Sequence, residues 1–390
     1  MNDILLLNKI AACGTDIFDK NNYSLSNDCE DPDAILVRSA AMHDMEFGPS
    51  LEAIARAGAG VNNIPIDRCS KEGIVVFNTP GANANGVKEL TLAALLLAAR
   101  DIVGGSKWAD SLAGESDVAA KVEKGKSSFA GIELKGKTLG VRGLGAIGGM
   151  VANVGDSPVI GMNVIGYDPY LSVEAAWNIS KSVTKASGYD EIFEKSDFIT
   201  VHVPLTPETK EMFNKESFAK MKDGVRIINL SRAGLVNTED MKEALKSGKV
   251  ARYVCDFPTD DTVGVEGIVS IPHLGASTEE SEDNCAMMAV RQLIDYLENG
   301  NIKNSVNFPS VSLERGNFKR LCVLHYNVPA VLSKISSAFA EDGINIEHLS
   351  NRSKGDLAYT MADVDIKEIP ESVVEKVAKI EGVIRINIKG

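Results

Sequence analysis

The sequence predicts an α/β protein: two doubly wound, Rossmann-like units followed by a smaller C-terminal βαββαβ unit. Short apolar strands alternate with helical stretches over residues 1–93, and the alternation restarts at residue 137 behind a glycine turn. From residue 318 the order of elements changes. Alternating strands and helices are typical of parallel sheets covered by helices. The length of 390 residues is enough for two or three domains.

In the first unit, residues 34–39 (AILVRS) and 73–80 (GIVVFNTP) read as buried strands that end in polar loops. Residues 51–58 (LEAIARAG) read as a helix closed by Gly58. A strongly apolar stretch over residues 90–100 predicts a buried helix. Residues 106–130 are polar and show no clear period.

In the second unit, strands are expected over residues 137–142, 163–170, 198–205, 225–231 and 251–257. Residues 277–300 predict one long amphipathic helix with a capping box between Ser277 and Glu280 and a stop at Gly300. Because Pro158 cannot continue a helix, the helix after the glycine turn is expected to end near Asp156.

Charge is unevenly distributed. There are 41 Lys and Arg against 54 Asp and Glu, a net charge of −13, whereas residues 318–390 hold ten of each sign. A net negative chain does not fit a non-specific nucleic-acid binder or a protein that adheres to anionic membranes. The six cysteines are scattered without a C-x-x-C pair, which indicates neither a zinc site nor a disulfide framework. We find no signal-peptide pattern and expect a cytoplasmic location without a metal cofactor.

Residues 143–148 (GLGAIG) match the dinucleotide-binding pattern G-x-G-x-x-G, between a predicted strand and a predicted helix. Gly143 permits the tight turn, Gly145 lets the backbone approach a diphosphate, and Gly148 lets helix and strand pack closely. Asp168 follows at the end of the next strand, where a carboxylate accepts hydrogen bonds from a ribose and repels a 2′-phosphate. The pattern therefore predicts NAD as cofactor. Arg142 breaks it with a charge at a strand position that is usually apolar, and we expect its long stem to carry that charge outward.

Three polar clusters follow later strands of this unit. Arg232 follows residues 225–231, Asp256 stands near the end of residues 251–257 with Asp260 and Asp261 beyond it, and His273 lies in a loop after Pro272. Ligands of open α/β sheets bind at the carboxyl ends of strands, so these loops should converge. Histidine suits proton transfer near neutral pH, a carboxylate orients it, and arginine binds a substrate carboxylate. The clusters predict oxidation of a hydroxy acid.

The runs RAGAGVNNIPID, GLGAIG, NLSRAGLV and IPHLGASTEES resemble the D-isomer-specific 2-hydroxyacid dehydrogenases, in particular those acting on 3-phosphoglycerate. The resemblance implies a discontinuous substrate domain (residues 1–93 and 284–308), an NAD domain (94–283), a linker (309–317) and a regulatory domain (318–390). It also implies that Arg232 binds substrate and cofactor and that His273 is the catalytic acid and base. The family's catalytic Glu is missing, which leaves Asp260 and Asp261 as alternative replacements.

The resemblance adds further site residues. Those expected to contact the cofactor are Thr79, Gly143, Gly145, Ala146, Ile147, Gly148, Asp168, Val203, Leu230, Ser231, Asp256, His273, Gly275 and Ala276. Those expected to contact the substrate are Arg38, Ser39 and Asn83, with Lys88 as a second candidate besides Arg38 for a phosphate group.

The βαββαβ order of the last 73 residues resembles an ACT domain, a small-molecule regulatory module. The resemblance implies L-serine as effector, with His325, Asn327 and Asn345 as ligands. Ala330 stands where many such loops have glycine.

The expected activity is NAD-dependent oxidation of 3-phospho-D-glycerate to 3-phosphohydroxypyruvate, the first step of L-serine biosynthesis, by a homo-oligomer. The alternatives are another D-2-hydroxyacid dehydrogenase, such as a glyoxylate or hydroxypyruvate reductase, and a catalytically silent NAD-sensing protein.

Overall fold

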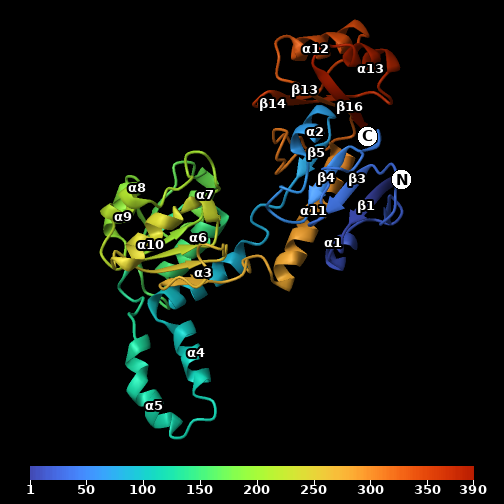
Figure 1. The fold of residues 1–390 in the computed structure, drawn as a ribbon. Helices are drawn as coiled ribbons and strands as arrows, with labels where there is room; N and C mark the ends of the chain where they lie inside the picture. Colours follow the sequence, from blue (N-terminus) through green and yellow to red (C-terminus); the bar gives the residue numbers. More distant parts are fainter. The chain divides into compact units, whose positions relative to one another are not determined.

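The computed structural model describes residues 1–390, apart from the side chain of Glu174, and divides into two compact units (Figure 1). Unit 1 comprises residues 1–83 and 282–390, and unit 2 comprises residues 84–281. The boundary expected between residues 93 and 94 falls inside helix α3 (Ala84–Ala99). The buried face of α3, including Ala94 and Leu95, packs in a core cluster of unit 2, so the whole helix belongs there.

Unit 1 contains a five-stranded parallel sheet in the order β2-β1-β3-β4-β5. Its strands are β1 (Asn2–Leu7), β2 (Tyr23–Ser26), β3 (Ala34–Val37), β4 (Ala53–Arg56) and β5 (Val75–Phe77), and its short helices are α1 (Ala12–Thr15) and α2 (Ile66–Lys71). The prediction of a helix over residues 51–58 is wrong, because β4 occupies that place. Its alanines favour a helix in isolation, but between β3 and β5 they are buried on both faces, and this packing prevails.

Unit 2 contains a seven-stranded parallel sheet in the order β12-β11-β10-β9-β6-β7-β8, the doubly wound arrangement that the sequence predicts. Its strands are β6 (Thr138–Arg142), β7 (Asn163–Tyr167), β8 (Thr184–Lys185), β9 (Phe198–Val201), β10 (Val225–Asn229), β11 (Val250–Cys255) and β12 (Ile268–Ser270). Its other helices are α4 (Ile102–Ser111), α5 (Val118–Gly125), α6 (Ala146–Asp156), α7 (Val173–Trp177), α8 (Tyr189–Lys195), α9 (Lys215–Lys220) and α10 (Thr238–Lys246), with 3₁₀ turns η1 (Lys126–Phe129) and η2 (Ala233–Leu235). Helix α6 ends at Asp156, which confirms the effect expected of Pro158.

The polar stretch after α3 is helical although it shows no clear period. Figure 1 shows α4 and α5 standing apart from the seven-stranded sheet, and neither helix buries a residue completely. Trp108 and Phe129 contact each other with ring centroids 5.2 Å apart. A helix without a buried face shows no apolar period, which is why the sequence pattern missed both.

Helix α11 (Glu279–Asn299) is the predicted long helix, but its cap lies one residue later than expected. The Oγ1 atom of Thr278 accepts a hydrogen bond from the backbone N–H of Ser281 at 3.1 Å, whereas the Ser277 hydroxyl donates to the carbonyl of His273. Gly300 ends the helix with φ +71°, as expected. No helix in the described part of the chain is long and apolar enough to cross a membrane.

The C-terminal part of unit 1 has the predicted βαββαβ order. Its elements are β13 (Lys319–Tyr326), α12 (Val331–Glu341), β14 (His348–Lys354), β15 (Leu357–Val364), α13 (Glu371–Ala378) and β16 (Val383–Lys389). The antiparallel sheet has the order β14-β15-β13-β16, and α12 and α13 cover one face (Figure 1). On the other face Cys322, Leu324 and Tyr359 share a core cluster with Tyr296 of α11 and Phe308.

Residues 301–317, which include the expected linker (309–317), form part of this packed structure. Ile302 and Val311 form a β-bridge with two backbone hydrogen bonds, and Phe308 and Val311 are buried. Asn307 accepts from the N–H of Val76 and donates to the carbonyl of Ile74 at the edge of the first sheet. The Asn, Ser and Pro content of residues 301–317 indicates a loop. Composition does not reveal that the Asn307 amide satisfies buried backbone groups of the first sheet.

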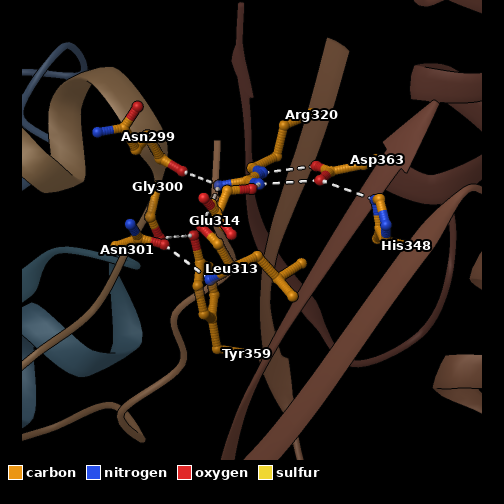
Figure 2. A network of polar contacts seen from close by, with 9 residues as sticks. All are labelled: Asn299, Gly300, Asn301, Leu313, Glu314, Arg320, His348, Tyr359 and Asp363. Atoms are coloured by element: carbon orange, nitrogen blue, oxygen red, sulfur yellow. Dashed lines mark hydrogen bonds and ion pairs between the residues drawn. The ribbon is translucent and has the colours of Figure 1, made fainter. Parts of the chain in front are cut away.

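Arg320 is the polar centre of this packing (Figure 2). It is completely buried and forms an ion pair with Asp363, with the second contact from Nη2 to Oδ2 at 2.8 Å. Its guanidinium also donates to three carbonyls, those of Asn299, Leu313 and Glu314. The arginine therefore joins the C-terminal sheet to the end of α11 and to the chain that follows it.

Candidate active site

The glycine turn between β6 and α6 has the geometry of a diphosphate site. Gly143 has φ +87°, and a Cβ built on it would lie 2.5 Å from the carbonyl oxygen of His202. A Cβ on Gly148 would lie 1.9 Å from the carbonyl oxygen of Gly143, so this close approach also requires glycine. A Cβ on Gly145 would meet nothing within 4 Å, and no side chain caps α6. The turn thus leaves open space in front of unpaired helical N–H groups, which suits an anion.

Asp168 stands at the end of β7, as predicted. Its Oδ2 atom accepts from the backbone N–H of Leu144 in the glycine turn, and its Oδ1 atom accepts from the N–H of Tyr170, both at 2.9 Å. These bonds hold the carboxylate against the turn at the position where a ribose is bound in this fold. The residues present therefore fit NAD. The other residues predicted around the turn are placed on it or on the loops after β9 and β10: Ala146, Ile147, Val203, Leu230 and Ser231.

Arg232 is held in place by an amide that sequence reasoning missed. The side chain of Asn229, buried at the end of β10, accepts from the N–H groups of Ser231 and Arg232 and donates to the carbonyl of Arg232 at 2.9 Å. The Ser231 hydroxyl donates to the carbonyl of Val201 at 2.7 Å. An asparagine at the end of a strand often accepts hydrogen bonds from backbone N–H groups two or three residues later, so Asn229 could have been identified from the sequence.

Asp256 and His273 lie on neighbouring loops. β11 and β12 pair in parallel, so the loop after β12 passes beside the end of β11. The rings of Phe257 and His273 are 4.6 Å apart, and a Cβ on Gly275 would lie 3.6 Å from Oδ2 of Asp256. Asp256 is 1% exposed, and neither of its carboxylate oxygens has a hydrogen-bond partner. Burial raises the pKa of Asp256 to about 6, opposed by the positive charges of His273 and Arg232.

Neither predicted replacement for the family's Glu is brought to the histidine. Asp260 and Asp261 are exposed, and in the part of the chain that the structure describes neither side chain forms a hydrogen bond or an ion pair with His273. The Thr259 N–H donates to the Thr262 hydroxyl at 2.8 Å, which closes the loop as a turn. Asp256 is the buried carboxylate on the loop beside His273, and the charge of His273 acts on its pKa.

The raised pKa of Asp256 predicts a stability effect with a defined sign. The unfolded chain releases this proton near pH 4, whereas the folded chain keeps it up to about pH 6. The wild type therefore loses stability as pH rises through that window. Asp256→Asn removes the effect, so its free energy of unfolding relative to wild type should increase by about 2 kcal/mol between pH 4 and pH 7. Urea unfolding across this range checks it, and a difference independent of pH would contradict the buried, unpartnered carboxylate.

The predicted substrate residues of unit 1 lie at the ends of its strands. Arg38, just after β3, pairs with Glu282, and the backbone N–H of Ser39 donates to Oδ1 of Asn8 at 3.0 Å. Arg56, which sequence reasoning missed, ends β4, and its Nε atom donates to the carbonyl of Arg38 at 3.0 Å. Two arginines therefore stand side by side at this edge of the sheet.

The other predicted residues near the first unit have mixed outcomes. Thr79 is fully buried, and its hydroxyl has no hydrogen-bond partner. Asn83 is the last residue of unit 1, partly buried before α3. Lys88 is not at the end of a strand of unit 1, where Arg38 lies. It lies in α3 of unit 2, where it donates to Oδ1 of Asn85 at 2.6 Å and lies 3.6 Å from Glu89.

The predicted effector ligands differ in availability. His325 is 3% exposed, its Nδ1 atom bonds the carbonyl of Tyr326, and its Nε2 atom bonds the hydroxyl of Thr360 at 2.9 Å. Asn327 and Asn345 are exposed and make local hydrogen bonds. The two asparagines are accessible to a ligand, whereas the histidine is occupied within the sheet.

Ala330 adopts the backbone conformation that favours glycine, with φ +70° at the start of α12. A Cβ in the left-handed region costs about 1 kcal/mol. We therefore expect Ala330→Gly to raise the free energy of unfolding by about that amount, measured by thermal denaturation. Ala340→Gly in the same helix is the control that should lower it, and a destabilising Ala330→Gly would contradict the assignment of strain.

Comparison with known proteins agrees with this geometry. Residues 92–275 match the NAD binding domain of the D-isomer specific 2-hydroxyacid dehydrogenases, and residues 321–385 match an AHAS small subunit-like ACT domain. NAD⁺-bound 3-phosphoglycerate dehydrogenase of Entamoeba histolytica is similar in structure, with a TM-score of 0.60, 27% identity, and coverage of 78% of this chain and 98% of that one.

The curated relatives include D-3-phosphoglycerate dehydrogenase of Methanocaldococcus jannaschii, 37% identical over 73% of this chain. This chain spans about half of that relative, 54% of its length. D-3-phosphoglycerate dehydrogenase 1 of Saccharomyces cerevisiae is 31% identical over 97% of this chain and 86% of the relative. The chain belongs to the D-isomer specific 2-hydroxyacid dehydrogenase family and carries a C-terminal ACT domain.

Proposed function

We propose that the chain catalyses NAD-dependent oxidation of 3-phospho-D-glycerate at C2 to 3-phosphohydroxypyruvate, the first step of L-serine biosynthesis. The observation that carries this proposal is the set of loops after β10, β11 and β12, which hold Arg232, Asp256 and His273 at one edge of the sheet with the glycine turn. The family assignment and the names of the relatives support it.

Bound at the glycine turn and Asp168, NAD would supply the hydride acceptor for the C2 carbon. Nε2 or Nδ1 of His273 takes the proton of the C2 hydroxyl, and Arg232 binds the substrate carboxylate through paired hydrogen bonds. Asp256, in its ionised form, stabilises the imidazolium that results, as a carboxylate partner does for histidine elsewhere. In this proposal Asp256 takes the place of the missing Glu.

A phosphorylated substrate needs further cations, and the candidates in unit 1 are Arg38 and Arg56. They are neighbours at the carboxyl ends of β3 and β4, where loops of an α/β sheet bind ligands. Lys88 of unit 2 is a third candidate, and its ammonium is engaged by Asn85 and Glu89 as the Arg38 guanidinium is by Glu282. Ser39 and Asn83 remain candidates for substrate contacts.

The test is NADH formation from 3-phospho-D-glycerate compared with D-glycerate. We expect a strong preference for the phosphorylated acid, with Arg38→Ala and Arg56→Ala raising its KM while leaving that of D-glycerate unchanged. A preference for reducing glyoxylate or hydroxypyruvate would favour the alternative reductase. Binding of NADH without turnover of any hydroxy acid would favour a silent NAD-sensing protein.

We further propose regulation by L-serine through Asn327 and Asn345, whose amides offer both donors and acceptors to an amino acid. His325 would have to release the Thr360 hydroxyl before it could bind the effector, because its Nε2 atom is bonded to that hydroxyl. Burial also lowers the pKa of His325, so the imidazole offers no positive charge to the effector carboxylate at neutral pH. Calorimetry with L-serine and the Asn345→Ala variant tests this, and an absence of both heat and inhibition would remove the proposal.

The chain is also proposed to form a homo-oligomer. Helices α4 and α5 bury no residue completely, and Ile102 and Val118 are exposed apolar residues on them. Light scattering of the purified chain, with Ile102→Glu as a variant, tests the assembly.

A further inference from the structure

Arg142 is a buried arginine at the end of β6, directly before the first glycine of the cofactor turn. Its residue is 6% exposed, so the expectation that its charge reaches outward is wrong. The guanidinium carbon lies 3.6 Å from the centroid of the Tyr189 ring and 5.6 Å from that of Phe193. Gly140 and Arg142 face α8 on the same side of the strand, where aromatic rings replace water around the cation.

The charge of Arg142 is not neutralised within the chain. Among the described residues no carboxylate lies within ion-pair distance of it, and its Nε atom is buried without a hydrogen-bond partner. Burial lowers the pKa of Arg142 to about 10, which still leaves it protonated at neutral pH. A buried cation without a counter-charge is costly to the folded state unless something else compensates it.

The backbone of Arg142 is bonded beside the cofactor turn, and its side chain packs on a pair of tyrosines. The carbonyl of Arg142 accepts from the N–H of His202 at 2.8 Å, and the N–H of Gly143 donates to the carbonyl of Tyr167 at 3.0 Å. The Tyr167 ring meets the Tyr189 ring edge-on at 4.7 Å. Burial lowers the pKa of His202 to about 4, so this histidine, whose backbone N–H bonds the carbonyl of Arg142, adds no positive charge beside the turn.

We propose that Arg142 is a positioning residue for NAD, whose unpaired charge provides the positive potential that holds the cofactor diphosphate at the glycine turn. The chain as a whole carries −13, so its overall field opposes an anionic ligand. A single buried cation acts strongly because the surrounding dielectric is low. The bound diphosphate then supplies the counter-charge that the protein lacks. The inference depends on NAD binding and is independent of the proposed oxidation.

The experiment measures cofactor affinity and stability separately on the full chain. For Arg142→Met we expect about a tenfold increase in the Kd of NADH, measured by fluorescence titration. The cofactor-free variant should be as stable as wild type or more stable, because the uncompensated buried charge is gone.

Two competitors and one matched variant separate charge from packing. ADP, which carries a diphosphate, should displace NADH less well from Arg142→Met than from wild type, whereas neutral adenosine should compete equally with both. Arg226 is the matched control, because it also lies over an aromatic ring, Phe198 at 5.5 Å, but near the amino end of β10 and bonded to the carbonyls of Ala98 and Gly224. Arg226→Met should lose stability and bind NADH normally.

An unchanged NADH Kd in Arg142→Met would overturn the proposal, whatever happens to stability. So would equal losses of ADP and adenosine affinity, since these would indicate lost packing and not lost charge. If wild type binds NADH but oxidises no hydroxy acid, the proposed function fails while this inference stays open to the same titrations.

Discussion

Replacing His273 by alanine is expected to lower kcat for the hydroxy acid by about 10²–10⁴-fold, the usual contribution of a positioned acid or base. The imidazole is exposed in its loop beside Phe257 and the buried carboxylate of Asp256, so it can exchange a proton with a bound hydroxyl. NADH binding should change little, because the glycine turn and Asp168 are untouched. Steady-state NADH formation and a fluorescence titration of NADH measure the two effects.

His348→Ala is the matched control, because His348 is an exposed histidine of the C-terminal sheet. It should leave kcat unchanged. A His273→Ala enzyme that retains kcat within tenfold of wild type would assign the proton transfer elsewhere.

Arg320→Met is expected to destabilise unit 1 by about 3–5 kcal/mol, because it leaves the Asp363 carboxylate buried without its partner. The variant also leaves three carbonyls without the guanidinium, including that of Asn299 at the end of α11 (Figure 2). Urea unfolding measures the loss. Faster proteolysis within residues 301–317 should accompany it, because these contacts hold that segment in place.

The double variant Arg320→Met with Asp363→Leu should recover part of the loss, since no charge is then left buried. Arg352→Met, at an exposed position of β14, serves as the control and should stay within about 0.5 kcal/mol of wild type. A loss below 1 kcal/mol in Arg320→Met would show that the ion pair does not hold the sheet to α11.

Asp256 and Arg142 share a physical property that helps to explain where local rules fail. Each is a buried charge with an unpartnered polar atom in unit 2, and each lies beside the predicted cofactor and substrate loops. Buried polar groups are normally satisfied, and exceptions in native proteins concentrate where stability is exchanged for function. Asp256→Asn and Arg142→Met are therefore both expected to raise the free energy of unfolding of the cofactor-free protein at neutral pH.

The sequence by itself determined the fold class, the glycine turn and the polar ends of the strands in unit 2. These features are local: the G-x-G-x-x-G spacing, the end of α6 before Pro158, and the βαββαβ order each depend on a few neighbouring residues. Strand ends of a parallel sheet meet at one edge, so the convergence of Arg232, Asp256 and His273 follows from topology.

Only the tertiary structure decided what depends on burial and on contacts between distant segments. Residues 53–56 form a strand because both their faces are covered, and the helix expected there hid Arg56 at the end of that strand. The burial of Arg142 on Tyr189, and of Arg320 on Asp363, involves partners 47 and 43 positions away. Sequence periodicity reports which residues share a face, whereas desolvation and pairing depend on what that face meets. This is why the sequence could not distinguish Asp256, which is buried, from Asp260 and Asp261, which are exposed.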